Sequence, residues 1–379
     1  MSKAIKAFGA AVLEESGKAM FGMEHVTRLC LTALYTGGHV LLEGNPGLGK
    51  TELVKTLGAL LRLPFGRIQF TPDLMPADIT GTYMPDLENR SRLSFREGPV
   101  FTSLLLADEI NRATPKTQSA MLEAMAERQV TVLGERRKLN QPFMVLATQN
   151  PIDHEGTYTL PEAQADRFMF KIEMPVPDAT TLRRIMAKQA GAIASVQAET
   201  QNPGSTASLL PKDEQDSRAK YEELQRRVRA VAPLPSLEAH ITNMFLASNR
   251  RFDALQGLEA QQTKRLRDIT NDLVRYGLGP RAAIALLLGA KAWTLLFSSH
   301  SEQADGPALA KILVPALRHR FQLHFGWQDR YAPGSAQSEF DLQDRLLVEF
   351  AQLCAPRANE YQRTFVANLP ETLRPANTK

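Results

Sequence analysis

The chain of 379 residues contains only two cysteines, Cys30 and Cys354, which lie far apart in the sequence. Two such thiols supply neither a disulfide framework nor a cysteine-based metal site, so we expect both to be packing residues in a reducing compartment. Long apolar runs are also missing, and the longest, residues 282–290, is far shorter than the ~20 residues of a bilayer span. No basic-then-apolar signal segment opens the chain. These features predict a cytoplasmic location and no membrane insertion.

Strong charge of one sign is absent too. The formal net charge is +4, and Lys and Arg are scattered along the chain. Such mild basicity permits contact with nucleic acid without favouring it. The hydrophobic share of 43% and the charged share of 23% are those of an ordinary globular protein, and the length suffices for two or three compact units.

The most informative segment that is present is a complete phosphate-binding loop. Its glycines let consecutive backbone N–H groups turn toward a phosphate, Lys50 can reach the β and γ oxygens, and the Thr51 hydroxyl can ligate magnesium. An apolar run precedes the loop and helical spacing follows it, so strand, loop and helix come in the required order. We therefore predict a nucleoside triphosphate site formed by Gly44, Asn45, Pro46, Gly47, Leu48, Gly49, Lys50 and Thr51.

From about residue 20 to 175, short apolar runs alternate with helical patterns, which predicts a parallel α/β sheet. Polar residues follow each of four candidate strands, at residues 40–42, 68–70, 104–106 and 143–147. Ligands of such sheets bind at the carboxyl ends of the strands, so we expect these four ends to face one crevice. Turn residues inside two shorter segments, 87–95 and 130–139, predict two hairpin insertions.

The remaining pattern divides the chain into four parts: an α/β core at 1–178, a helix and low-complexity linker at 179–220, a helical lid at 221–330 and an amphipathic C-terminal extension at 331–379. Residues 191–217 have few large apolar groups, as flexible linkers do, and helical spacing resumes from Tyr221. The extension carries an apolar stripe that we expect to pack on the lid more readily than in a partner's groove. The stripe consists of Phe340, Leu342, Leu346, Leu347, Phe350 and Leu353.

An acidic pair, Asp108 and Glu109, ends the third candidate strand. After a phosphate loop, such a pair can supply both a magnesium contact and a base. We assign the metal contact to Asp108 and the activation of the attacking water to Glu109, which predicts hydrolysis.

Together these segments resemble MoxR-type AAA+ ATPases, in the branch whose second core helix is interrupted by a hairpin. The resemblance spans residues 20 to 325 and is carried by the phosphate loop and by residues 68–74, 107–112, 147–151, 160–168 and 279–282. It implies an AAA+ P-loop core with a parallel sheet and hairpin insertions, followed by an all-helical lid. ATP and Mg²⁺ are the implied cofactors.

The resemblance also implies roles that no single residue would reveal. Asn150 corresponds to the first sensor, which orients the attacking water, although a turn-forming Asn before Pro151 would look the same. Arg167 corresponds to an arginine finger that enters a neighbouring subunit's site, with Arg112 as a second candidate for an interface role. Arg281 corresponds to the second sensor, which reports the nucleotide state to the lid.

Two departures from the family pattern concern the nucleotide. Many relatives carry Val-Gly-Gln near the adenine, whereas this chain has Phe21, Gly22 and Met23, so Gly22 is kept and the polar third residue is not. Base selectivity is therefore left open. The second-sensor arginine usually follows Ser-Pro, and here it follows Gly279 and Pro280.

The leading functional expectation is a ring-forming ATPase, a homo-oligomer of hexameric form, that remodels or activates a protein client or a von Willebrand factor A domain partner. A nucleic-acid translocase is the alternative, since basic residues on the hairpins, Arg90, Arg92, Arg96, Arg136, Arg137 and Lys138, could meet phosphates. Phe95 is the single aromatic residue beside them, which disfavours base stacking. A nucleotide-switched scaffold with little turnover is the third reading, and the intact acidic pair argues against it.

Overall fold

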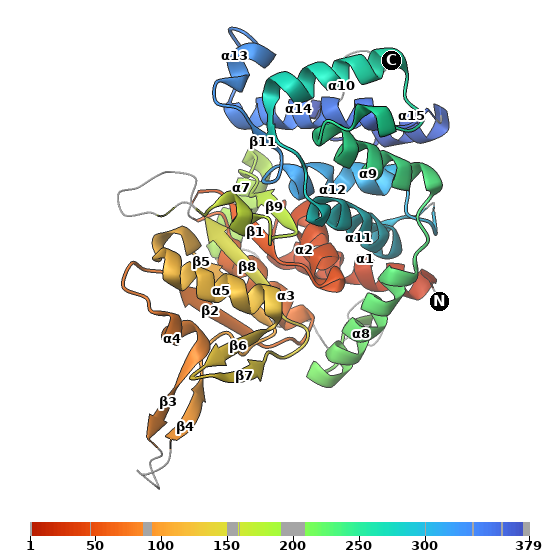
Figure 1. The fold of residues 1–379 in the computed structure, drawn as a ribbon. Coiled ribbons are helices and arrows are strands. Elements are labelled where there is room, and N and C mark those ends of the chain that lie inside the picture. The colour runs from red at the N-terminus through yellow and green to blue at the C-terminus, as the bar shows by residue number, and fades with distance from the viewer. Residues whose placement is uncertain are drawn as a thin grey trace. The chain divides into compact units, whose positions relative to one another are not determined.

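The computed structural model describes residues 2–45, 47–85, 93–149, 158, 160–190, 209–299, 301–335, 337–357 and 359–373. The chain divides into two compact units, a core unit of residues Lys3–Gln225 and a helical unit of residues Arg226–Lys379 (Figure 1).

The core unit combines helices with nine strands in its described part. Its helices are α1 (Ser2–Ala19), α2 (Glu24–Thr36), α3 (Lys50–Leu60), α4 (Pro76–Thr80), α5 (Pro115–Glu127), α6 (Glu162–Ala165) and α7 (Ala179–Gln189), with a 3-10 turn, η1 (Ile110–Arg112), and with most of α8 (Glu214–Ala230). Its strands are β1 (Val40–Glu43), β2 (Phe65–Gln69), β3 (Gly81–Pro85), β4 (Leu93–Glu97), β5 (Leu104–Asp108), β6 (Gln129–Val132), β7 (Glu135–Lys138), β8 (Met144–Gln149) and β9 (Phe170–Glu173).

Five parallel strands form the central sheet, in the order β2-β5-β8-β1-β9. All four residues of β1 are buried, as are most residues of β5 and β8, which explains their continuous apolar sequences. The predicted α/β class and its four strands are confirmed, with ends that shift by one to three residues. The sequence analysis missed the edge strand β9, which begins only at Phe170 and ends before the proline-rich turn at Pro175.

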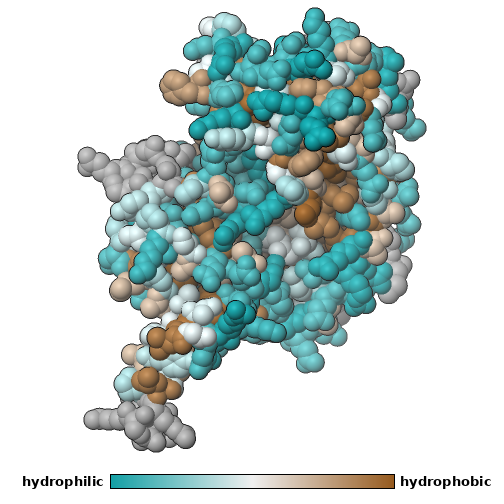
Figure 2. Space-filling view, viewed as in Figure 1, coloured by the Kyte–Doolittle hydropathy of each residue, from teal (hydrophilic) through white to brown (hydrophobic). Residues whose placement is uncertain are grey.

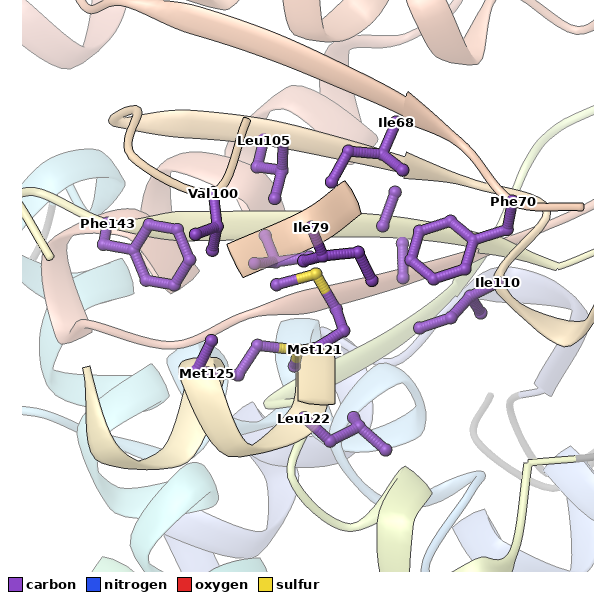
Figure 3. Close-up of a cluster of buried hydrophobic side chains, with 14 of the residues drawn as sticks. Ile68, Phe70, Ile79, Val100, Leu105, Ile110, Met121, Leu122, Met125 and Phe143 are labelled. Carbon is purple, nitrogen blue, oxygen red and sulfur yellow. The ribbon is translucent and has the colours of Figure 1, made fainter. Parts of the chain in front are cut away.

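A buried apolar cluster joins this sheet to helices α4 and α5. Figure 3 shows Ile68 and Leu105 from the sheet on one side of the cluster, and Met121 and Met125 from α5 on the other. Because these side chains are almost completely removed from water, they fix α5 and the η1 turn relative to the strand ends. The other labelled members are Phe70, Ile79, Val100, Ile110, Leu122 and Phe143.

Two antiparallel hairpins leave the sheet, and Figure 1 shows β3 and β4 extending away from it. The second prediction, 130–139, is confirmed by β6 and β7, whose turn residues Leu133 and Gly134 both have positive φ, as a tight hairpin turn requires. The first prediction, 87–95, is wrong at its start, because the hairpin begins at Gly81, where α4 ends; residues 86–92 lie outside the described part. Figure 2 shows brown, hydrophobic patches on this hairpin. Met84 and Leu93, one on each of its strands, are exposed.

The helical unit is built mainly from α9 (Pro235–Ser248), η4 (Phe252–Ala254), α10 (Ala260–Leu273), α11 (Pro280–Phe297), α12 (Gly306–Leu317), α13 (Trp327–Tyr331), α14 (Glu339–Cys354), α15 (Asn359–Ala367) and η5 (Glu371–Leu373). The helical second part expected from the sequence is confirmed, with one addition, an antiparallel pair of β10 (Val274–Tyr276) and β11 (Gln322–Leu323). Helix α11 is long and apolar enough to cross a membrane. Half of it is buried inside the protein, where it packs on α9 and α12 as a core helix does.

The two segments that the sequence analysis left without a role differ in what the structure describes. Of the expected linker, residues 191–208 lie outside the described part, and α8 already begins at Glu214. The apolar stripe of the C-terminal extension lies on α14, which contacts α9, α10 and α12. Leu342, Leu346, Leu347 and Phe350 are buried there, so the prediction that the stripe packs on the protein's own helices is confirmed for these four residues.

We expect Phe350→Ala to destabilise the helical unit by about 3–5 kcal/mol, because Phe350 is 0% exposed and contacts Phe321 at a ring-centroid distance of 5.0 Å. Phe340→Ala is the matched control, since the same substitution in the same helix removes a ring that is 42% exposed. Urea unfolding followed by circular dichroism would compare the two. Equal losses of stability would contradict the packing described for α14.

Candidate nucleotide site

The phosphate-binding loop connects β1 to the N-terminus of α3. Gly44, Gly47 and Gly49 all have positive φ, at 151°, 82° and 80°, conformations in which a side chain would be strained. A Cβ at Gly47 or Gly49 would meet no atom within 4 Å, so the left-handed backbone, and not crowding, requires glycine there. The side chain of Lys50 folds back toward the loop, where its Nζ donates to the carbonyl oxygen of Gly44. Pro46 lies outside the described residues.

Lys50 is set among carboxylates at the end of the sheet. Burial lowers the pKa of Lys50 from its ordinary value, and the negative charges of Asp108, Glu43 and Glu109 oppose that shift. Glu43 is itself buried and paired with Lys171 at 2.9 Å. The ammonium group of Lys50 can form charge-assisted hydrogen bonds to phosphate oxygens.

Asp108 and Glu109 are joined through one hydroxyl group, that of Thr148 on β8. Thr148 Oγ1 donates to Asp108 Oδ1 at 2.7 Å and accepts from the backbone N–H of Glu109 at 2.8 Å. Glu109 has left-handed backbone angles, φ 57° and ψ 49°, which turn its side chain away from the strand direction. The threonine thus fixes the orientation of the metal-binding candidate and the backbone of the candidate base.

Three further side chains donate to the two carboxylates. Arg67 Nη2 donates to Asp108 Oδ2 at 2.7 Å, and Gln69 Nε2 donates to Glu109 Oε2 at 2.9 Å. Arg112 Nη1 donates to the same Glu109 oxygen at 2.8 Å. Arg112 is therefore a partner of Glu109 within its own chain.

Both acids line one cavity of about 490 Å³ together with Thr148, Arg67, Gln69 and the phosphate loop. The expectation that the four strand ends face one crevice is confirmed, because β1, β2, β5 and β8, or the loops that follow them, all contribute to its wall. The lining consists of Gly44, Gly47, Gly49, Lys50, Thr51, Glu52, Lys55, Arg67, Gln69, Asp108, Glu109 and Thr148.

A second cavity, also of about 490 Å³, lies on the other side of the loop and shares Gly47, Gly49 and Glu52 with the first. Its walls include the expected Phe21, Gly22 and Met23. Gly22 has φ 74°, and a Cβ there would approach Thr181 Cγ2 to 3.3 Å. Largely apolar walls suit a planar base. The remaining lining residues are Ala19, Met20, Leu48, Pro175, Val176, Pro177, Asp178, Thr181, Ile185, Lys188 and Gln189.

The structure does not gather all the expected residues here. Asn150 lies outside the described residues, directly after the end of β8. Arg167 is absent from the linings of both cavities, and its Nη1 donates to the carbonyl oxygen of Leu122 at 2.6 Å. Arg281 belongs to the helical unit, where it is exposed in the first turn of α11.

Sequence reasoning assigned no role to Arg67, Gln69 or Thr148. Their strand positions become informative only once the strand order is known. In a parallel sheet, the polar residues at the ends of the strands beside β5 must lie near its terminal acid, and Gln69 is the register partner of Asp108.

Known proteins share the sequence and the fold of this chain. The model of the "ATPase family associated with various cellular activities (AAA)" matches residues 39–170. The uncharacterized protein YeaC of Bacillus subtilis is 38% identical over 318 residues, which cover 83% of this chain and 87% of YeaC. The chaperone MoxR1 of Mycobacterium tuberculosis is 48% identical over 172 residues, or 45% of each chain. The chain belongs to the MoxR family of AAA ATPases.

A solved structure extends the likeness to the whole fold. The crystal structure of a proposed ATPase from Cytophaga hutchinsonii has a TM-score of 0.72 and 32% sequence identity, and it covers 92% of this chain and 96% of that one. The family resemblance, the AAA core with its helical C-terminal region and the expectation of an ATPase are thereby confirmed. As an AAA ATPase, the protein binds ATP.

We expect Thr148→Val to lower ATP hydrolysis by about 10- to 100-fold, the usual effect of removing a group that orients a ligand-binding carboxylate. Valine keeps the shape of this buried residue but can neither donate to Asp108 nor accept from Glu109. Steady-state phosphate release would measure the change. Thr148→Ser should restore most of the rate, and full activity in the valine variant would show that the hydroxyl is dispensable.

Proposed function

We propose that the two cavities hold a single Mg²⁺–ATP, with the base on the side of Gly22 and the phosphates between Lys50 and Asp108. The arrangement that supports this most directly is the Asp108–Thr148–Glu109 contact at the wall of the cavity that also contains the phosphate loop. Lys50 binds the β and γ phosphates. Glu109 accepts a proton from the attacking water, which is the step a carboxylate at this place can perform.

Thr51 and Asp108 are the residues that would hold the magnesium ion. Both line the same cavity, and a hydroxyl with a carboxylate is the oxygen donor set that Mg²⁺ prefers. When bound, the ion neutralises charge that develops on the β and γ oxygens.

For the remaining roles we propose Asn150 as the residue that orients water, Arg281 as the lid's reporter of nucleotide state, and Arg167 as a finger acting in a neighbouring subunit. The absence of Arg167 from both of its own chain's cavities supports a role elsewhere. A finger acting between subunits requires an oligomer, which we take to be a hexameric ring.

We further propose that the ring remodels a protein client, alone or with a von Willebrand factor A domain partner, in the cytoplasm. The similarity to MoxR1, which is named a chaperone, supports the client's being a protein. The hairpins give less support to a nucleic-acid translocase. The guanidinium of Arg137 lies 4.0 Å from the centre of the Phe95 ring, so it covers a face on which a base would stack.

We expect Glu109→Gln to keep ATP affinity within about threefold and to lower hydrolysis by about two to four orders of magnitude, the usual span for loss of a general base. Binding of a fluorescent ATP analogue and phosphate release would be measured on the same preparation. Lys50→Ala is the contrasting variant, because it should lose nucleotide binding itself. Near-normal turnover in Glu109→Gln would rule out the base role.

If Arg167 acts between subunits, Arg167→Ala and Lys50→Ala proteins should each be nearly inactive and should recover activity when mixed. The Lys50→Ala subunit binds no ATP but still offers Arg167 to a neighbour that does. Phosphate release is measured across mixing ratios. A second mixture, with a Lys50→Ala/Arg167→Ala subunit as partner, is the control. If neither mixture recovers ATP hydrolysis, Arg167 acts within its own chain or only structurally.

A further inference from the structure

Arg67 occupies one of the two oxygens of the candidate metal-binding carboxylate. Asp108 Oδ1 accepts from the Thr148 hydroxyl, and Asp108 Oδ2 accepts from Arg67 Nη2, both at 2.7 Å. Because Thr148 is 1% exposed and is held from both sides, Oδ1 is committed to it. A cation that approaches from the cavity therefore meets Oδ2, where the guanidinium lies.

The same nitrogen of Arg67 also orients the neighbouring glutamine. Arg67 Nη2 donates to Gln69 Oε1 at 2.9 Å, and Gln69 Nε2 donates to Glu109 Oε2 at 2.9 Å. Arginine can only donate and an ionised carboxylate can only accept, so the amide oxygen must face Arg67 and the amide nitrogen must face Glu109. One guanidinium nitrogen is thus linked to both acids, directly to Asp108 and through Gln69 to Glu109.

We propose that Arg67 is a positioning residue that competes with Mg²⁺ for Asp108 and, through Gln69, links arrival of the metal to release of Glu109. Two cations cannot share Oδ2 without strong repulsion, so the ion displaces the guanidinium. Displacement also removes the donor that fixes the Gln69 amide, which loosens the bond between Gln69 and Glu109. Glu109 then loses its link to β2 and keeps the contact from Arg112. This inference rests on the proposed roles of Asp108 and Glu109.

The exposure of the groups involved favours such an exchange. The Arg67 side chain is 47% exposed and that of Asp108 16%, so water reaches the guanidinium and can replace the carboxylate as its partner. Arg112 donates to the same Oε2 atom of Glu109. Because its side chain is 51% exposed, it can keep this contact when the carboxylate separates from Gln69.

Metal affinity tests the competition without measuring turnover. The full-length protein is saturated with a non-hydrolysable ATP analogue and titrated with Mn²⁺, whose paramagnetic resonance signal reports the free ion. We expect Arg67→Ala to bind Mn²⁺ about three- to tenfold more tightly than the unchanged protein, the range for loss of one partly exposed ion pair. Affinity for the analogue in EDTA should stay within about twofold. Arg183→Ala, a change of an exposed arginine on α7 outside both cavity linings, is the matched control and should leave both affinities unchanged.

Gln69→Leu tests the link between the two acids. It removes the acceptor that helps to hold Arg67, so it should tighten Mn²⁺ binding by a smaller factor, and it should add nothing in the Arg67→Ala background. Unchanged or weaker Mn²⁺ binding by folded Arg67→Ala overturns the competition, and a concurrent loss of analogue affinity in EDTA would identify Arg67 as a phosphate ligand instead. Additive effects of the two changes overturn the link through Gln69. Asp108→Asn distinguishes failure of the competition from failure of the metal assignment. If this variant binds Mn²⁺ as the unchanged protein does, Asp108 is not a metal ligand.

Discussion

The parallel register of β2, β5 and β8 is the constraint on which the whole site depends. Gln69 is paired with Asp108, and Ala107 with Ala147, so Thr148 necessarily lies beside the end of β5. Parallel strands that end together place their last side chains and the first loop residues at one edge. The acids therefore need no long-range positioning by distant loops, because the backbone pairing of the buried sheet already brings their partners within hydrogen-bonding distance.

The same pairing makes an unfavourable backbone conformation tolerable. Glu109 has φ 57°, a left-handed conformation that costs a non-glycine residue on the order of 1 kcal/mol. Its N–H is held by Thr148, and its carbonyl oxygen accepts from the N–H of Arg112 at 2.9 Å, which starts the η1 turn. Below this turn, Ile110 and Ala113 are fully buried in the apolar cluster. The packing of the turn and the hydroxyl group of Thr148 together stabilise the left-handed conformation of Glu109, which is unfavourable for an isolated residue of this type.

The sequence predicted those parts of the structure that depend on short-range patterns. The phosphate loop, the strand ends of β1 and β5 and the long helix α11 each have a local signal, either glycine spacing or apolar periodicity. By contrast, Arg67 and Gln69 lie on a half-exposed edge strand, where polar residues are ordinary and carry no mark of function. Their importance comes from the neighbouring strand, and neighbours in a parallel sheet can be far apart in sequence. The hairpin start at Gly81 was missed for a related reason. A Cβ at Gly81 would lie 2.3 Å from the carbonyl oxygen of Arg96, a crowding that only the partner strand creates.

Burial divides the surroundings of the two acids into a fixed half and a changeable half. Thr148 is inside the sheet, and breaking its bonds would leave the part-buried N–H of Glu109 without this acceptor. The bonds from Arg67, Gln69 and Arg112 reach the acids from exposed positions, where water can replace any partner that leaves. Each exchange there costs much less than the free energy that holds the sheet together. The proposed mechanism needs both properties at one place, since the acids must keep their positions while their charge partners change with the nucleotide. The strand order meets this need because β8 lies at the centre of the sheet, and β2 lies at its edge.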